Sequence, residues 1–226
     1  MKRLFLPLIA VFIAGSISAQ NKSTRNLSHF DEIDVGTAIT VTLVKGSSEK
    51  AEISVTGTDE ENVITEVSGG ELKVHMKSGN YRHVDARVTV TYVSLEGISI
   101  SSAAKLTADE PVRSEKMEIN VSSAGKGVVN LDVEKLEANI SSAGNLSVKG
   151  RTGRQEVDVS SAGGYDADDL QCDDAEINVS SGAHASIIAK KYLDAQANSG
   201  GSIRYKGHPD KEYTSENSGG NVRRAD

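Results

Sequence analysis

Tryptophan is absent from this chain of 226 residues, and aromatic side chains of all kinds make up only 4% of it. Large aromatic side chains usually dominate the core of a compact globular domain, so their scarcity argues against a core of that kind. The core must instead be built from Val, Ile, Leu and Ala, several of which favour strands. The composition therefore favours an all-β protein.

Cysteine is also scarce, and acidic residues outnumber basic ones by 32 to 25. Cysteine occurs once, at Cys172, so no disulfide can form within the chain. No neighbouring residue supplies a base, and we therefore expect Cys172 to be a small buried residue without reactivity. The formal net charge is −7, and loss of Lys2 and Arg3 with the leader described next takes it to −9. A chain this acidic repels phosphate backbones, so nucleic acid is not an expected partner.

No hydrophobic run is long enough to cross a membrane as a resident helix. The longest, residues 4–14, falls short of the roughly 20 apolar residues that a span needs. Its basic start and the small residues that follow are typical of a secretory signal cleaved between Ala19 and Gln20. We expect residues 1–19 to be this signal peptide, and the mature chain to have no transmembrane segment. It would reside in the periplasm, on the outer-membrane surface or outside the cell.

A four-residue motif, SSAG in its commonest spelling, recurs along the mature chain. Successive copies start 18 to 21 residues apart. The seven copies begin at Ser101, Ser122, Ser141, Ser160, Ser180, Asn198 and Asn217. A period near 20 residues, held over more than half of the mature chain, is typical of a solenoid.

The residues before each motif alternate between apolar and polar. In "MEINVSS", residues 117–123, Met117, Ile119 and Val121 fall on one face, and "LEANISS" and "AEINVSS" repeat the pattern. A period of two indicates strands, and 20 residues leave no room for a helical crossover. The sequence predicts a right-handed parallel β-helix with rungs of 19–20 residues, stacked at the spacing of about 4.8 Å between strands.

The repeated motif itself is interpreted as the corner of each rung. Strand parity, continued through the motif, places the second serine of every copy on the inward face, next to small residues that permit a bend. These inward residues would form a corner ladder whose hydroxyls bond to the turn or to one another. Its members are Ser102, Ser123, Ser142, Ser161, Ser181, Ser199 and Ser218.

The repeat also divides the chain. Residues 20–26 are expected to be a flexible N-terminus and residues 96–226 the regular β-helix. Residues 27–95 read as strands of uneven length without the motif, forming either early rungs or a separate β-cap. At the other end the charges of "NVRRAD" would discourage growth of the stack.

The stretch "FDEIDVGTAITVTLVKGSSEKAEISVTGTDEENVITEVSGGELKVHM", followed by "SISSAAKL", "NVSSAG" and "NISSAG", resembles the auto-transporter adhesin head domain, or GIN domain, family. The resemblance extends from about Asn26 to Arg224. It implies an exported protein of a Gram-negative bacterium with a β-helical structure. The family brings no established active site that could be carried over to this chain.

Several patterns look like catalytic or metal-binding motifs. Ser102–Lys105 and Ser123–Lys126 match the S-x-x-K of penicillin-binding enzymes, but that serine opens a helix, whereas these end strands and recur. The acidic stretch "YDADDLQCDD" offers oxygen ligands suited to Ca²⁺, yet matches no calcium-loop spacing. Ion pairing of these carboxylates with Arg or Lys one period away is the favoured alternative. The weak metal candidates are Asp166, Asp168, Asp169, Asp173 and Asp174.

No set of residues supplies a nucleophile, an acid and a base together, so we predict no catalytic residue and no cofactor. The favoured hypothesis is a non-enzymatic exported β-solenoid, an adhesin-like or structural module of the cell envelope. Its partners would be glycans or another envelope or cell-surface protein. The alternative is a polysaccharide lyase or hydrolase on the same scaffold. The carboxylates of the Asp166–Asp174 stretch are the only residues that support it.

Overall fold

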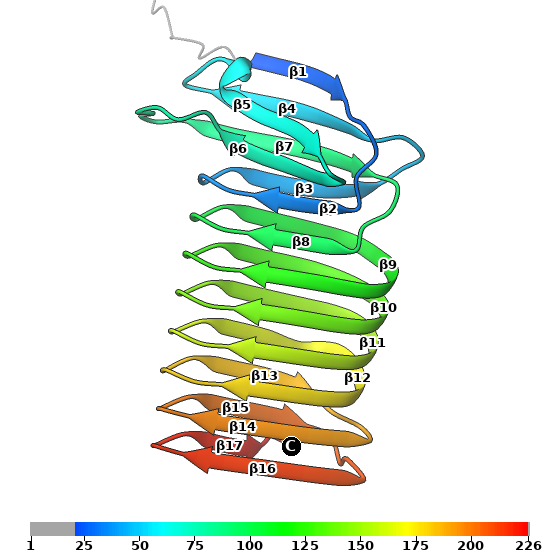
Figure 1. Cartoon of the computed structure of the whole chain (residues 1–226), viewed down its shortest axis with the longest axis vertical. Coiled ribbons are helices and arrows are strands. Elements are labelled where there is room, and N and C mark those ends of the chain that lie inside the picture. Colours follow the sequence, from blue (N-terminus) through cyan, green and yellow to red (C-terminus); the bar gives the residue numbers. More distant parts are fainter. Residues whose placement is uncertain (1–20, 226) are drawn as a thin grey trace, which may run out of the picture.

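The computed structural model describes residues 21–225, which form an upright stack of flattened coils (Figure 1). Strands dominate: apart from one 3₁₀ turn, η1 (Glu60–Asn62), this part of the chain holds no helix, and so none that could cross a bilayer. The predicted all-β parallel solenoid is confirmed. The proposed signal peptide and its cleavage site at Ala19 and Gln20 lie outside the described residues.

The regular rungs begin at β8 and continue to the C-terminus. Strands β9 to β12 are 15 to 17 residues long, and each bends halfway, so that it contributes to both sides of the flattened coil. In the last two rungs the same path is divided into separate strands. The strands are β8 (Gly97–Ile100), β9 (Lys105–Val121), β10 (Lys126–Ile140), β11 (Asn145–Val159), β12 (Gly164–Val179), β13 (His184–Ile188), β14 (Tyr192–Asn198), β15 (Ser202–Lys206), β16 (Lys211–Asn217) and β17 (Asn221–Arg224).

Each rung pairs in parallel with the next, and the register is continuous except for a shift between Val129 and Leu131, where β10 pairs with β9, and one between Ser147 and Lys149, where β11 pairs with β12. We call the side formed by β8, the second halves of β9 to β12, β14 and β16 the front sheet. The first halves of β9 to β12, with β13, β15 and β17, form the back sheet. The motif turns join front to back along one edge of the stack, and the bends join back to front along the other (Figure 1).

The N-terminal third combines a parallel rung with an antiparallel cap. Strand β2 (Glu32–Val35) pairs in parallel with β6 and β8, and β3 (Thr40–Lys45) with β7 and β9. The rung β2–β3 is therefore inserted between strands that come later in the chain. Antiparallel pairing then links β1 to β4, β4 to β7 and β5 to β6. The cap strands are β1 (Asn21–Asn26), β4 (Lys50–Thr56), β5 (Val63–Ser68), β6 (Glu71–Met76) and β7 (Asp85–Tyr92).

The core is a set of aliphatic columns that run along the stack. One column places Ile100, Val121, Ile140, Val159 and Val179 in register, and each of these side chains is about 1% exposed. Because each inward side chain rests on the equivalent side chain of the next rung, β-branched and leucine side chains fill most of the interior, and only a few aromatic side chains such as Phe30 and Tyr165 are buried with them.

One polar cluster is buried within this aliphatic core. The Tyr165 hydroxyl donates a hydrogen bond of 2.9 Å to Oε1 of Gln155, and Nε2 of Gln155 donates to the carbonyl oxygen of Ile188 at 3.3 Å. Burial raises the pKa of Tyr165 well above its ordinary value, and it raises the pKa of the Cys172 thiol to about 12. Cys172 is thus a buried, protonated thiol, as the sequence predicts.

The orientation predicted for the motif serines is wrong. All seven second serines are exposed, and their φ angles lie between 48° and 54°. The next residue, such as Ala124 with φ 59°, is also left-handed, and Gly125 N–H donates to the Ser122 carbonyl at 2.8 Å. Two consecutive left-handed residues define a type I′ turn. Strand parity fails there, and the residue after the turn, glycine or alanine, occupies the buried position.

The final rung carries polar side chains at inward positions. Glu212 and Glu216 are in register with buried Leu193 and Ala197, and Arg224 with buried Tyr205. Glu212 accepts a hydrogen bond of 2.6 Å from the Tyr205 hydroxyl and pairs with Arg224 at 2.6 Å. Inward charges discourage the addition of a further strand. This rung therefore closes the aliphatic stack.

Candidate functional site

The outward side chains of the front sheet form rows that run from rung to rung. Pairing places Glu118, Glu137, Glu156 and Glu176 in one row and Lys116, Lys135 and Arg154 in the row beside it. Alternation explains the rows, since positions two residues apart share a face and a parallel register repeats them in each rung. The outer face is thus organised by the same repeat as the core.

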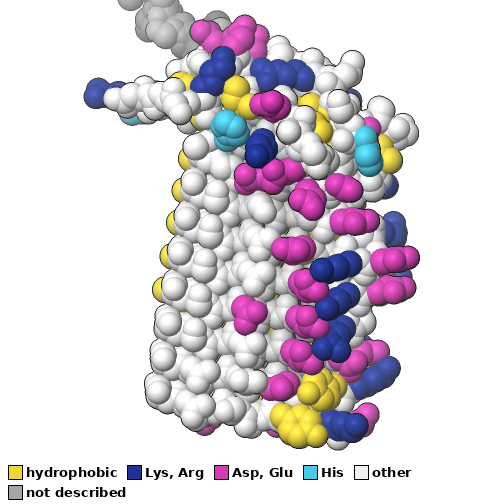
Figure 2. All heavy atoms as spheres, in the orientation of Figure 1, with side chains coloured by type: hydrophobic (Ala, Val, Ile, Leu, Met, Phe, Trp, Pro, Cys, Tyr) yellow, Lys and Arg dark blue, Asp and Glu magenta, His cyan; other side chains and the backbone are white. Residues whose placement is uncertain are grey.

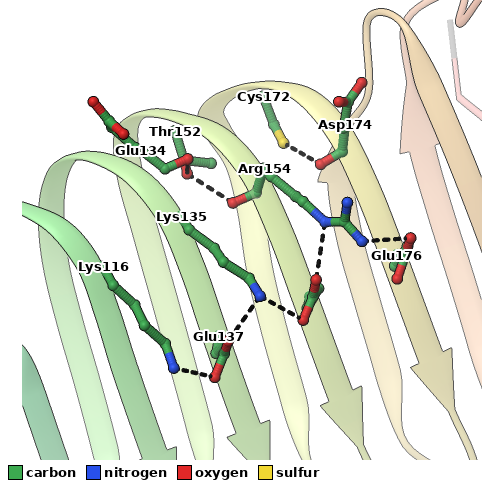
Figure 3. A network of polar contacts seen from close by, with 10 residues as sticks. Lys116, Glu134, Lys135, Glu137, Thr152, Arg154, Cys172, Asp174 and Glu176 are labelled. Carbon is green, nitrogen blue, oxygen red and sulfur yellow. Dashed lines mark hydrogen bonds and ion pairs between the residues drawn. The ribbon is translucent and has the colours of Figure 1, made fainter.

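The two rows are joined into a continuous ladder of ion pairs (Figure 3). Lys116 Nζ lies 2.8 Å from Oε2 of Glu137, and Lys135 Nζ lies 2.8 Å from Glu137 and 3.0 Å from Glu156. Arg154 lies 2.9 Å from Glu156 and 2.7 Å from Glu176. Hydrogen bonds from Lys116 and Lys135 lower the pKa of Glu137 below its ordinary value. Lys116, Lys135 and Arg154 are each paired with at least one glutamate, and in the glutamate row only Glu118 has no ion pair among the described residues.

The ladder is interrupted near the C-terminal end. The position after Arg154 in the cation row is Asp174, followed by Tyr192, and the carboxylate row continues from Glu176 to Asp194 and then Tyr213. The two tyrosine rings are in contact, with centroids 5.9 Å apart and planes inclined by 50°. Tyr213 is 57% exposed. Hydrophobic side chains stand at this end of the charged face in Figure 2.

A hollow of about 400 Å³ opens beside Tyr192. Two of its lining residues, Lys191 and Asp210, come from the segments that divide the last rungs into separate strands. Lys191 is held by Asp173 at 2.8 Å, and Arg154 is held by the ladder. The hollow is lined by Arg154, Asp174, Glu176, Lys191, Tyr192, Asp210 and Lys211. We call this hollow, together with Tyr213, the tyrosine hollow.

The five aspartates proposed as weak metal candidates do not share one centre. Asp168 pairs with Arg204 and Lys206, each at 3.2 Å, and Asp173 pairs with Lys191. Asp166 and Asp169 are exposed, and only Asp174 lines the tyrosine hollow. Residues 21–225 contain no group of three or more His, Cys, Asp or Glu placed to hold a metal ion.

Arg151 and Arg154, which precede the acidic stretch by about one period and were expected to pair with its aspartates, pair with other carboxylates. Arg151 pairs with Asp132 at 2.5 Å, and Arg154 belongs to the ladder. The serines of the two S-x-x-K matches, Ser102 and Ser123, stand in exposed type I′ turns.

The contact between Tyr192 and Tyr213 was not predicted from the sequence. Their places in the printed sequence differ by 21 residues, more than one average rung, so they do not align in the repeat. They meet diagonally, because Tyr192 pairs with Lys211 and Tyr213 stands two residues further along the same face. The signal that could have found them is the departure of both positions from the Lys and Glu of earlier rungs.

The fold and its outer face define an all-β solenoid whose front sheet carries a charged ladder ending in an aromatic pair. The family described as "Putative auto-transporter adhesin, head GIN domain" matches residues 29–209, and the chain belongs to that family.

Several solved structures share the fold. A putative adhesin from Bacteroides fragilis superimposes with a TM-score of 0.78 at 18% identity, covering 92% of this chain and 97% of that one. A putative lipid binding protein from Parabacteroides distasonis gives 0.72 at 22% identity, covering 93% and 98%. A putative adhesin from Parabacteroides merdae gives 0.73 at 19%, covering 93% and 98%. The comparison with curated proteins gives no match.

Proposed function

We propose that the mature chain, released by cleavage between Ala19 and Gln20, is an exported, non-enzymatic binding module of the cell envelope. The front sheet is the face that meets the partner, which is a glycan or another envelope protein. Membership of an adhesin-head family supports the envelope location and the binding role. The stacked scaffold supports it too, because a solenoid offers a long rigid face on which side chains keep fixed spacings.

The observation that carries this proposal is the interruption of the ladder at the tyrosine hollow. From Lys116 to Arg154, each cation of the front-sheet ladder is paired with a glutamate. At Tyr192 and Tyr213 the face instead offers aromatic surface beside a concave polar lining. A small concave site with an apolar surface and a few polar groups is the usual form of a binding site.

A polysaccharide lyase or hydrolase would need carboxylates or basic groups that converge on one substrate position. The Asp166–Asp174 stretch distributes its carboxylates over several contacts instead, and Asp168 and Asp173 are engaged in ion pairs. This arrangement favours binding without turnover.

The test uses the mature chain, residues 20–226, immobilised and exposed to an array of polysaccharides and to outer-membrane vesicles. Product formation is measured in parallel, as new reducing ends for hydrolysis and as unsaturated sugar absorbance for lyase action. Retention without product is the expected result. Turnover that disappears in Asp168→Ala and Asp169→Ala variants would show an enzyme, and absence of retention on every probe would overturn the binding role.

A further inference from the structure

The repeat provides an internal control for the role of Tyr192 and Tyr213. Lys116, Lys135 and Arg154 occupy the row of Tyr192, and glutamates occupy the row of Tyr213 in four earlier rungs. The scaffold therefore accepts long charged side chains at these positions. The ring of Tyr213, which is 57% exposed, leaves apolar surface in water beyond what its contact with Tyr192 covers, and that surface is available to a ligand.

The lining of the tyrosine hollow is balanced in charge. Three cationic side chains face three carboxylates, and they are Arg154, Lys191 and Lys211 against Asp174, Glu176 and Asp210. A site without surplus charge does not select anions or cations. It is suited to an uncharged ligand that carries many hydrogen-bonding groups.

Part of this lining is free to bind. Among residues 21–225, no ion pair involves Asp174, Asp210 or Lys211, whereas Arg154, Glu176 and Lys191 are held in place by ion pairs. The free carboxylates accept hydrogen bonds and the free ammonium group donates them. The hollow thus combines walls held by ion pairs with three charged groups that have no ion-pair partner among the described residues.

We propose that the tyrosine hollow binds a neutral carbohydrate. The apolar face of a sugar ring stacks on the exposed ring of Tyr213, Tyr192 contacts the edge of the same sugar, and ring hydroxyls bond to Asp174, Asp210 and Lys211. The volume of about 400 Å³ falls at the low end of small-ligand sites, which suits a short oligosaccharide segment rather than a buried lipid chain. The inference rests on the proposed binding function and names the ligand class of the same face.

The experiment measures binding of the mature chain to four hexasaccharides by titration calorimetry. Cellohexaose, maltohexaose and mannohexaose are the neutral probes, and hexagalacturonate is the acidic one. We expect at least one neutral probe to bind and the acidic probe to bind more weakly. Tyr213→Ala and Tyr192→Ala are expected to weaken binding about tenfold each, equivalent to about 1.4 kcal/mol, while Tyr213→Phe keeps the ring and the affinity.

Tyr81→Ala is the matched control, because Tyr81 lies in the separate hollow beside Thr37 and Met76. It should leave binding unchanged. Because Tyr213 is exposed, its variants should unfold at the wild-type temperature, which checks that loss of binding is not loss of fold.

Neutral-sugar binding that survives in the Tyr192→Ala, Tyr213→Ala double variant would overturn the assignment of the site and leave the binding function standing. Preference for hexagalacturonate, or no binding to any neutral probe, would overturn the ligand class. In that case the binding function is still tested independently, by whether the wild-type chain retains outer-membrane vesicles.

Discussion

The backbone N–H of Ala124 donates a hydrogen bond of 3.0 Å to the carbonyl oxygen of Ser142 in the next rung. The same bond links each motif turn to the following one, so the turns form a backbone ladder along one edge of the solenoid. This ladder requires two consecutive left-handed residues in every rung, a conformation that costs a residue other than glycine about 1–2 kcal/mol.

Replacement of Ala124 by glycine is expected to stabilise the protein. Glycine adopts the φ of 59° at this position without strain, although it gains more freedom in the unfolded chain. The net gain should be about 0.5–1 kcal/mol, measured by urea denaturation. Equivalent positions in later rungs already hold Gly182, Gly200 and Gly219.

Ala138→Gly is the matched control, because Ala138 is a buried alanine within a strand and has no positive φ. It should lose about 0.5–1 kcal/mol. Equal destabilisation by the two substitutions would show that the turn stores no strain.

Gly144→Val should be strongly destabilising. A Cβ at this position would lie 2.6 Å from the carbonyl oxygen of Val121, so the neighbouring rung would have to move. Overpacking of this kind costs about 1–3 kcal/mol or more. A lower melting temperature is the expected readout, and an unchanged melting temperature would show that the two rungs do not pack this closely.

Tyr165→Phe is expected to cost about 1–2 kcal/mol, because Oε1 of Gln155 loses its buried donor. The double variant Tyr165→Phe, Gln155→Leu removes both partners and should recover part of the loss. Denaturant midpoints of the two single variants and the double variant give the coupling. Additive effects would show that the hydroxyl and the amide do not interact in solution.

The ion ladder predicts a loss of stability in acid. The lowered pKa of Glu137 means that this carboxyl stabilises the folded state above its ordinary pKa of about 4.3, and that the contribution disappears as pH falls through the lower folded value. Glu137→Gln should lower the melting temperature at pH 6 and have less effect at pH 3.

Glu118→Gln is the control for the ladder, since Glu118 forms no ion pair among the described residues. The effect of Glu137→Gln should also shrink at 1 M NaCl, because exposed pairs are screened by salt. A melting-temperature difference that is independent of both pH and salt would contradict the ladder.

The inward polar side chains of the last rung are expected to prevent one molecule from stacking on another. Glu212→Leu, Glu216→Val and Arg224→Leu together would continue the aliphatic columns to the C-terminal end, and concentration-dependent oligomers are expected. Sedimentation velocity would detect them. A variant with Lys211→Leu and Ser215→Val alters outward positions of the same strand, and equal association of both variants would refute the capping role.

The sequence predicts the regular part of the fold well because seven copies of the same motif, at nearly even spacing, each indicate the same rung. Alternation at residues 117–121 identifies the inward side chains, and Met117, Ile119 and Val121 are all buried. The prediction failed at Ser123 because alternation assumes an extended backbone, and two left-handed residues reverse the chain there. The alternation of apolar and polar residues does not show at which residue the extended backbone stops.

The tyrosine hollow was harder to predict for a different reason. Lys191 and Asp210 reach it from bends whose lengths differ from those of the earlier rungs, so their places in the repeat do not indicate their positions. Tyr192 and Tyr213 meet diagonally across two strands, which requires the exact pairing of β14 with β16. A one-residue change in that pairing would turn one ring inward.

The inserted rung β2–β3 has a consequence for the order in which the molecule can assemble. Its two flanks are β6 and β7 on one side and β8 and β9 on the other, all synthesised after it. A chain that emerges N-terminus first cannot enclose this segment until the residues up to Thr107 of β9, about sixty beyond Lys45, have followed it. Completion of the amino-terminal third therefore waits for a strand from the middle of the sequence.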